Sequence, residues 1–210
     1  MADYLLYAKQ HYGIEFSMFS FNESDLGIDV LHTPQEHADF IKEFGAYLAG
    51  LNLPTRMLLG DNSDATTFDF ILPALNNSEI HKYIGAVSFH SWRGCDDVTL
   101  KKWADAAKAI NVPLLVGEGS TDAAAHGYAE IFNESTFALY EINLYTRICA
   151  ICQPLSILQW QLTSDYSLLW GDGIYGSKGP LRPTQRFWNI KQLASTPADA
   201  LAIPVSRSEE

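Results

Sequence analysis

Carboxylate side chains follow two of the most apolar segments of this sequence. Glu118 ends the run "PLLVG" (113–117), and Glu23 follows the run "IEFSMFSF" with Asn22 between them. An ionised carboxylate costs several kcal/mol to take out of water unless it is paired or hydrogen-bonded, so an acid at the end of a buried strand has a structural partner or a chemical task. The structural alternatives are an ion pair between Glu118 and a base such as Arg56, and capping of a helix N-terminus by Glu23.

Polar and aromatic side chains also follow the other apolar segments. In chain order, the ends of these segments carry Asn22, Glu23, Asp61, Asn62, His90, Trp92, Glu118, Trp160 and Gln161. Two carboxylates suit acid/base and nucleophilic work on a glycosidic bond, and indole faces suit the apolar faces of sugar rings. A retaining double displacement needs the two carboxyls about 5 to 5.5 Å apart, which two glutamates facing one another across the strand ends would allow.

Five apolar segments rich in β-forming residues are predicted to be the strands that position these side chains. They lie at 13–21, 55–60, 84–92, 112–119 and 154–162. Because they are apolar at both odd and even positions, they fit a parallel sheet covered on both faces. Strand and helix alternate along the chain, which favours an open doubly wound sheet or a (β/α)8 barrel. No glycine-rich phosphate loop follows any strand, which argues against nucleotide binding.

The clearest helix between these strands is predicted over 34–49. Thr33 and Glu36 can form a capping box at its start, Pro34 suits its first turn, and Gly50 is expected to stop it. The other helical patterns lie within 68–84, with an interruption near Pro73, and at 98–110, 129–152 and 183–194. We expect these helices to flank the sheet in a single domain.

The composition of the 210 residues describes a globular chain with an acidic surface. Hydrophobic residues make up 47% of it, enough for one substantial core. The formal net charge is −11 and the 14 basic residues are scattered, so nucleic acid and anionic membranes are not expected as partners. No apolar run reaches the roughly 18 residues that a membrane span needs. Cys95, Cys149 and Cys152 cannot build a disulfide framework and are expected to be core residues.

Two of the strand ends resemble a known enzyme clan. "FSFNES" and "LLVGEG" look like the fourth and seventh strands of clan A glycoside hydrolases, and "ILQWQL" is similar to the eighth strand of that clan. The ending "RFWNIKQLASTPADALAIPVS" most resembles family 30 of these hydrolases, in which the last barrel helix leads into a β-sandwich. The resemblance implies a retaining hydrolase of β-linked glycosides that needs no metal or organic cofactor. Its partner would be an oligosaccharide, a polysaccharide or another glycoside.

The resemblance also implies a role for each candidate residue. Glu23 would be the general acid/base and Glu118 the nucleophile, which hydrogen bonds would keep ionised. Asn22 would bind the sugar 2-hydroxyl. The remaining candidates for substrate contact are His90, beside the nucleophile or a hydroxyl, Trp160, under the sugar ring, and Asp61 and Trp92, at the rim by strand position. Loop residues near the mouth could also contact sugar, namely His126, Tyr128, Tyr166 and Tyr175.

The resemblance further implies an incomplete barrel. If 13–21 is the fourth strand, the chain holds strands 4 to 8, whereas a complete barrel typically has about 250 residues. We therefore expect residues 1–210 to form a single partial (β/α)8 barrel without strands 1 to 3 and without the β-sandwich. Its open sheet edges predict self-association. Localisation is unknown from the residues, and only the resemblance favours secretion, since relatives are usually exported.

Two other classes of function stay open at this level. A barrel remnant without turnover would act as a carbohydrate-binding or scaffold protein, and the absent strands favour that alternative. A metal-dependent hydrolase could use His90 with Asp61, although the sequence has no His-x-His or His-Glu-x-x-His spacing.

Overall fold

The computed structural model describes residues 1–197 and 199–203, and five parallel strands form its main sheet. The strands pair in the order β1-β2-β3-β4-β5, each parallel to its neighbour. Their bounds are β1 Met18–Phe19, β2 Arg56–Asn62, β3 Ile84–Phe89, β4 Leu114–Gly119 and β5 Ser156–Gln159. The prediction of five parallel strands is confirmed. The first and last strands, which form the two edges of the sheet, are shorter than predicted.

Helices occupy the connections between the strands. The α-helices are α1 Ala2–Tyr12, α2 Pro34–Gly50, α3 Leu72–Leu75, α4 Asp97–Ala109, α5 Ser135–Cys152 and α6 Gln185–Ala194, with 3-10 helices η1 Ala65–Ile71, η2 His81–Tyr83 and η3 Ala125–Asn133. The capping box of Thr33 and Glu36 on α2 is confirmed. Gly50 was predicted to lie just beyond the end of this helix, but it is the last helical residue. The helix predicted over 129–152 is divided, because Glu134 is extended between η3 and α5.

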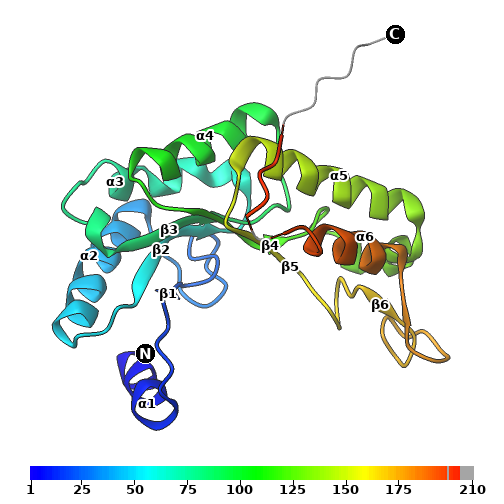
Figure 1. Ribbon diagram of the computed structural model, residues 1–210, viewed down its shortest axis with the longest axis horizontal. Helices are drawn as coiled ribbons and strands as arrows, with labels where there is room; N and C mark the ends of the chain where they lie inside the picture. Colours follow the sequence, from blue (N-terminus) through cyan, green and yellow to red (C-terminus); the bar gives the residue numbers. More distant parts are fainter. Residues whose placement is uncertain (198, 204–210) are drawn as a thin grey trace.

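The helices cover one face of the curled sheet. Figure 1 shows α3, α4 and α5 along one side of it, with α1 and β6 beyond the opposite side. Met57 and Val116 point to the covered face and are buried in the main core, whereas Leu58 and Leu115 alternate with them and are only half-buried. On β5, Leu158 is 53% exposed. The prediction of a sheet covered on both faces therefore holds for the central strand β3, where residues 86–89 are all buried, but not for β5, and the structure is a half-barrel.

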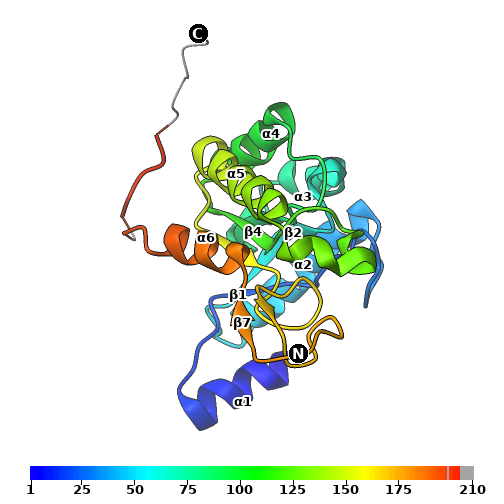
Figure 2. The ribbon, with the colours of Figure 1, turned by 90° about the vertical axis from the view of Figure 1, so that its right-hand side faces the viewer.

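A small second sheet follows the fifth strand. Its strands β6 (Leu169–Trp170) and β7 (Arg182–Pro183) are antiparallel. The sequence pattern did not predict it, because strands of two residues have no measurable periodicity. Strand β7 leads directly into α6, which packs beside α5 (Figure 2). Among the described residues, no helix combines the length and apolarity needed to cross a membrane.

Candidate active site

The carboxyl ends of the strands bring the predicted residues to one edge of the sheet. Backbone hydrogen bonds join neighbouring strand ends there: the amide of Glu23 donates to the carbonyl of Asp61 at 3.1 Å, and that of Trp160 to Gly119 at 2.9 Å. The amide of His90 donates to the carbonyl of Asn62, beside Asp61, at 2.9 Å. Residues that are far apart in sequence therefore share one rigid rim.

His90 lies between the two glutamates. Its Nδ1 is 3.1 Å from Oε1 of Glu23 and 3.3 Å from Oε2 of Glu118. One carboxylate oxygen of Glu23 and one of Glu118 lie within 4.8 Å of one another. The two carboxyls thus project from the same edge, and their separation is compatible with the roughly 5 to 5.5 Å of a retaining mechanism.

Glu118 is held by side chains from three different segments. Trp92 donates from Nε1 to Oε2 at 3.1 Å, and Asn22 donates from Nδ2 to Oε1 at 3.4 Å. The ion pair with Arg56 that the sequence allowed is not formed, because Arg56 begins β2 at the opposite end of the sheet. Glu118 is therefore oriented by hydrogen bonds from neutral side chains at the strand ends and not by a basic residue of a neighbouring strand.

The pKa of Glu118 is raised, although the expected hydrogen bonds that favour its ionised form are present. The residue is only 8% exposed, and this burial raises its pKa above the usual value. The positive charge of His90 and the hydrogen bonds from Trp92 and Asn22 act in the opposite direction, while the charge of Glu23 raises the pKa further. Desolvation outweighs the hydrogen bonds at this position.

Asp61 is not at the rim, where its strand position had suggested it would be. It is 7% exposed and lies beneath His90, with its Oδ1 3.3 Å from the ring Nε2. Hydroxyl groups of Ser20 and Ser88 donate to its two oxygens at 2.6 and 2.8 Å. Burial alone would raise the pKa of Asp61, but His90 and the two serines lower it. The ionised Asp61 therefore supports the ring of His90 from beneath, and its side chain is turned away from the surface.

Trp92 is also buried, at 9% exposure, and does not form an open rim. Its ring packs edge-on against Tyr166 with centroids 4.7 Å apart, while its indole N–H points to Glu118. Trp160 keeps 38% of its surface exposed and is the indole at this edge that could offer a face to a sugar. The sequence could not separate the two indoles, because both follow apolar strands.

His90 carries a positive charge at neutral pH in this arrangement. Burial of the ring on its own would lower its pKa, but the carboxylates of Asp61, Glu23 and Glu118 raise it to about 9. Nε2 has no well-aligned hydrogen-bond partner, so its 3.3 Å contact with Asp61 acts through charge. The imidazolium is thus shared by three acids that would otherwise repel one another.

Backbone geometry at the strand ends is unusual. Glu23 and Asp61 both adopt left-handed conformations, with φ of 49° and 60°. Such residues cost of order 1 to 3 kcal/mol each and cluster at functional sites. A Cβ on Gly60 would lie 2.5 Å from the carbonyl of Ser88, and one on Gly117 would lie 2.1 Å from Oδ1 of Asp61. Glycine directly before an acid, in "GD" and "GE", is the sequence signal for this close packing.

A clamp that the sequence did not indicate anchors the loop of Glu23. Asp25 accepts hydrogen bonds from the backbone amide of Ser63 at 3.0 Å and from its hydroxyl at 2.8 Å. The contact joins the loop after β1 to the loop after β2. No local pattern could have revealed it, because the partners are 38 residues apart in the chain.

Among the described residues, one group could hold a metal ion, and it is the same triad of Glu23, His90 and Glu118. It differs from the pair of His90 with Asp61 that the sequence allowed, since Asp61 faces the other ring nitrogen. A metal requires a neutral imidazole, whereas the surrounding carboxylates favour the protonated ring. A metal ion at this triad would therefore have to displace the proton that the carboxylates hold on the ring.

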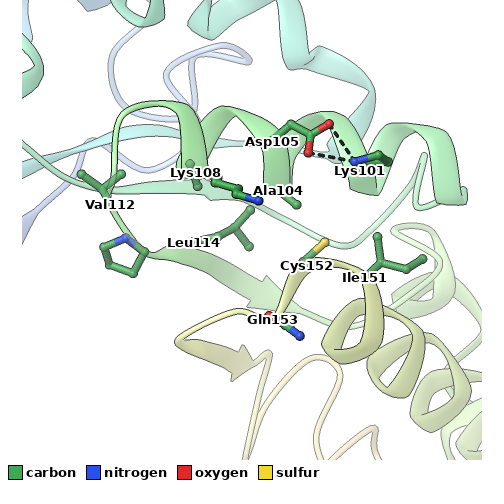
Figure 3. A pocket seen from close by; sticks show the side chains of 11 residues that line it. Lys101, Ala104, Asp105, Lys108, Val112, Leu114, Ile151, Cys152 and Gln153 are labelled. Carbon is green, nitrogen blue, oxygen red and sulfur yellow. Dashed lines mark hydrogen bonds and ion pairs between the residues drawn. The ribbon is translucent and has the colours of Figure 1, made fainter. Parts of the chain in front are cut away.

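A hollow of about 430 Å³ lies elsewhere, at the amino-terminal end of β4 (Figure 3). Figure 3 shows Lys101 and Asp105 on α4, bound to one another, beside Cys152 at the end of α5. Glu118 occupies the other end of β4, so this hollow is separate from the candidate site.

The fold is that of one part of a glycoside hydrolase barrel. The chain is similar to a monomeric β-xylosidase from Caulobacter crescentus CB15, with a TM-score of 0.67 and 14% identity over 92% of this chain and 45% of that chain. It is similar to the GH39 enzyme from Xanthomonas axonopodis pv. citri, with a TM-score of 0.66 and 13% identity over 92% of this chain and 44% of that chain.

A third similar structure is the catalytic domain of GH30 xylanase C from Talaromyces cellulolyticus. Its TM-score is 0.58 and its identity 14%, over 90% of this chain and 43% of that chain. No protein-family model and no curated protein sequence matches this chain. The resemblance to clan A glycoside hydrolases is thus confirmed for the fold, and the chain spans less than half the length of these structures.

Proposed function

We propose that this chain is the catalytic portion of a retaining hydrolase of β-linked glycosides. The observation that carries the proposal is the pair of facing carboxylates, Glu23 and Glu118, with oxygens within 4.8 Å at one edge of a glycoside-hydrolase-like sheet. In the first step Glu118 attacks the anomeric carbon while Glu23 gives its proton to the leaving oxygen. In the second step Glu23 takes a proton from water, which then displaces Glu118 and restores the free sugar with retained configuration.

Neighbouring residues have supporting roles in this mechanism. Asn22 would share its amide between Glu118 and the sugar 2-hydroxyl, and Trp160 would carry a ring face. The imidazolium of His90, held from below by Asp61, would lower the repulsion between the two glutamates and keep their carboxyls in register. Trp92 would orient Glu118 and would not contact the sugar through an open face.

The proposed functional unit contains more strands than this chain. Residues 1–210 would form the portion with strands 4 to 8 of a (β/α)8 barrel as a single domain, and another polypeptide segment would supply strands 1 to 3. The unpaired edges β1 and β5 and the 53% exposure of Leu158 support this. Two copies of the chain could also cover these edges, and a dimer in sedimentation equilibrium would favour that arrangement.

The test uses two alanine variants and azide. With an aryl β-glycoside, Glu118→Ala should lose turnover, and azide should restore it with a product of inverted configuration. Glu23→Ala should lose about 10² to 10⁴-fold on substrates with poor leaving groups but keep the first step for good ones, with azide giving a product of retained configuration. The opposite pattern would exchange the two roles.

The same assay separates the competing functions. Turnover that persists in a chelator excludes a metal-dependent hydrolase that uses Glu23, His90 and Glu118 as ligands. Sugar binding without turnover in the wild-type chain, alone and after addition of the strands 1 to 3 of a related barrel, would favour a carbohydrate-binding or scaffold protein. Full activity of both alanine variants on an unactivated glycoside would place the site elsewhere.

A further inference from the structure

A buried ion pair lies behind the candidate site, between the last two helices. Glu141 on α5 and Arg186 on α6 are 1% and 0% exposed. The guanidinium donates twice, from Nε to Oε2 at 2.9 Å and from Nη2 to Oε1 at 2.7 Å. The ring centroids of Phe132 and Phe137 lie 4.8 and 5.3 Å from Cζ of Arg186. Replacing such a pair by apolar side chains is often neutral or stabilising, so stability alone does not explain its presence.

The acid of this pair binds both strand ends that carry the site. Oε1 of Glu141 accepts from the hydroxyl of Ser120, two residues after Glu118, at 3.0 Å. It also accepts from the amide of Gln159 at 3.4 Å, and the same amide nitrogen donates to the carbonyl of Trp160 at 3.0 Å. Glu141 is therefore linked to β4 beside one predicted catalytic group and to β5 beside the exposed indole.

The base of the pair binds the loop that follows Trp160. Nη1 of Arg186 donates to the carbonyls of Tyr166 at 2.9 Å and Ser167 at 3.0 Å. The ring of Tyr166 packs on Trp92, and Trp92 donates to Glu118. A second route thus runs from the ion pair to the same carboxylate.

Resting on the proposed function, we infer that Glu141 and Arg186 are positioning residues for the Glu118 and Trp160 side of the site. Neither touches the predicted reacting atoms. Their hydrogen bonds to the strand ends and the loop hold parts of the chain from β4 to α6 in one arrangement. Figure 1 and Figure 2 both show α5 and α6 side by side, so the pair is fixed by two rigid helices.

The decisive variant replaces both charges at once. Removing one partner would leave a buried unpaired charge and strongly destabilise the fold, whereas Glu141→Met with Arg186→Met keeps the net charge and fills similar volume. We expect this double variant and the wild type both to unfold cooperatively. In the unliganded protein, amide hydrogen exchange within 159–168 should accelerate at least tenfold. On an aryl β-glycoside, kcat/KM should fall at least tenfold.

The matched control removes an exposed ion pair on α4. Lys101→Ala with Asp105→Ala should change exchange within 159–168 and kcat/KM by less than twofold. If the double methionine variant does not fold, Gln159→Met decides the question, since it leaves the ion pair intact and removes the amide that links Glu141 to Trp160. It should accelerate exchange within 159–168 and raise KM several-fold, with kcat changed by less than twofold.

The outcomes keep this inference separate from the proposed function. A wild-type chain that exchanges slowly within 159–168 but hydrolyses no glycoside contradicts the proposed function and leaves the ion-pair result intact. Unchanged exchange in the double methionine variant, or in Gln159→Met where that variant does not fold, overturns the positioning role. Accelerated exchange with unchanged kcat/KM in an active protein also overturns it, because the pair would then be structural only.

Discussion

The charge of His90 should make the folded protein lose stability between pH 7 and 8.5. Three carboxylates, those of Asp61, Glu23 and Glu118, raise the pKa of the ring from 6.5 to about 9 although burial opposes them. The folded chain therefore holds a proton that the unfolded chain releases near pH 6.5. This stability is fully present below pH 6.5 and is lost as the pH rises through about 9. Over pH 7 to 8.5 the linkage relation gives a loss of about 2 kcal/mol in the free energy of unfolding.

The other groups with shifted pKa values titrate mainly outside the range from pH 7 to 8.5. Burial lowers the pKa of His37 to about 4, so this ring is largely neutral above pH 7 in both states. Burial raises the pKa of Cys95 and of Cys152 to about 12 and also raises that of Cys149, so the thiols begin to add a pH dependence as the pH approaches 8.5, where unfolded cysteines ionise. Within the window, the slope belongs chiefly to His90.

The assay is urea unfolding followed by tryptophan fluorescence at three pH values from 7 to 8.5. The wild type should lose more stability than His90→Gln over the same range, by about the amount given above, because the variant's side chain does not titrate while the cysteines contribute equally in both proteins. The absolute stability of the variant is not the readout, since removing a cation from between acids costs stability at every pH. Equal slopes in the two proteins would refute a charged His90.

Three further outcomes are expected. Gly117→Ala should destabilise the fold by about 1 to 3 kcal/mol in urea unfolding, because its Cβ would lie 2.1 Å from Oδ1 of Asp61. The control Gly127→Ala, whose Cβ would have no atom within 4 Å, should stay within about 0.5 kcal/mol of wild type. Equal losses of stability in the two variants would contradict the close packing at Gly117. Thr33→Ala removes the cap of α2 and should cost about 1 kcal/mol, which an unchanged urea midpoint would disprove. Trp160→Ala should raise KM for an aryl glycoside roughly fivefold, equivalent to about 1 kcal/mol, with little change in stability because the ring is 38% exposed, and an unchanged KM would remove it from the site.

The sequence by itself determined the features that depend on local pattern and on the geometry of parallel sheets. The capping box at Thr33 needs residues three apart, so it could be predicted from the sequence. Apolar segments alternating with helical ones predict parallel strands, and parallel strands place their carboxyl ends at one edge. Glu23, His90 and Glu118 could therefore be expected to meet at that edge from the sequence alone, although the distances between them could not be predicted.

Only the tertiary structure decided which way each side chain at that edge points. Asp61 and Trp160 occupy equivalent places at strand ends in the sequence, yet one is buried beneath His90 and the other is exposed. The difference comes from the left-handed backbone of Asp61 and from serines on β3 and near β1. The pairing of Glu141 with Arg186, which are 45 residues apart in the chain, also depends on how two helices pack. Partners of buried polar groups are chosen by packing between elements, and periodicity within one segment carries no information about that packing.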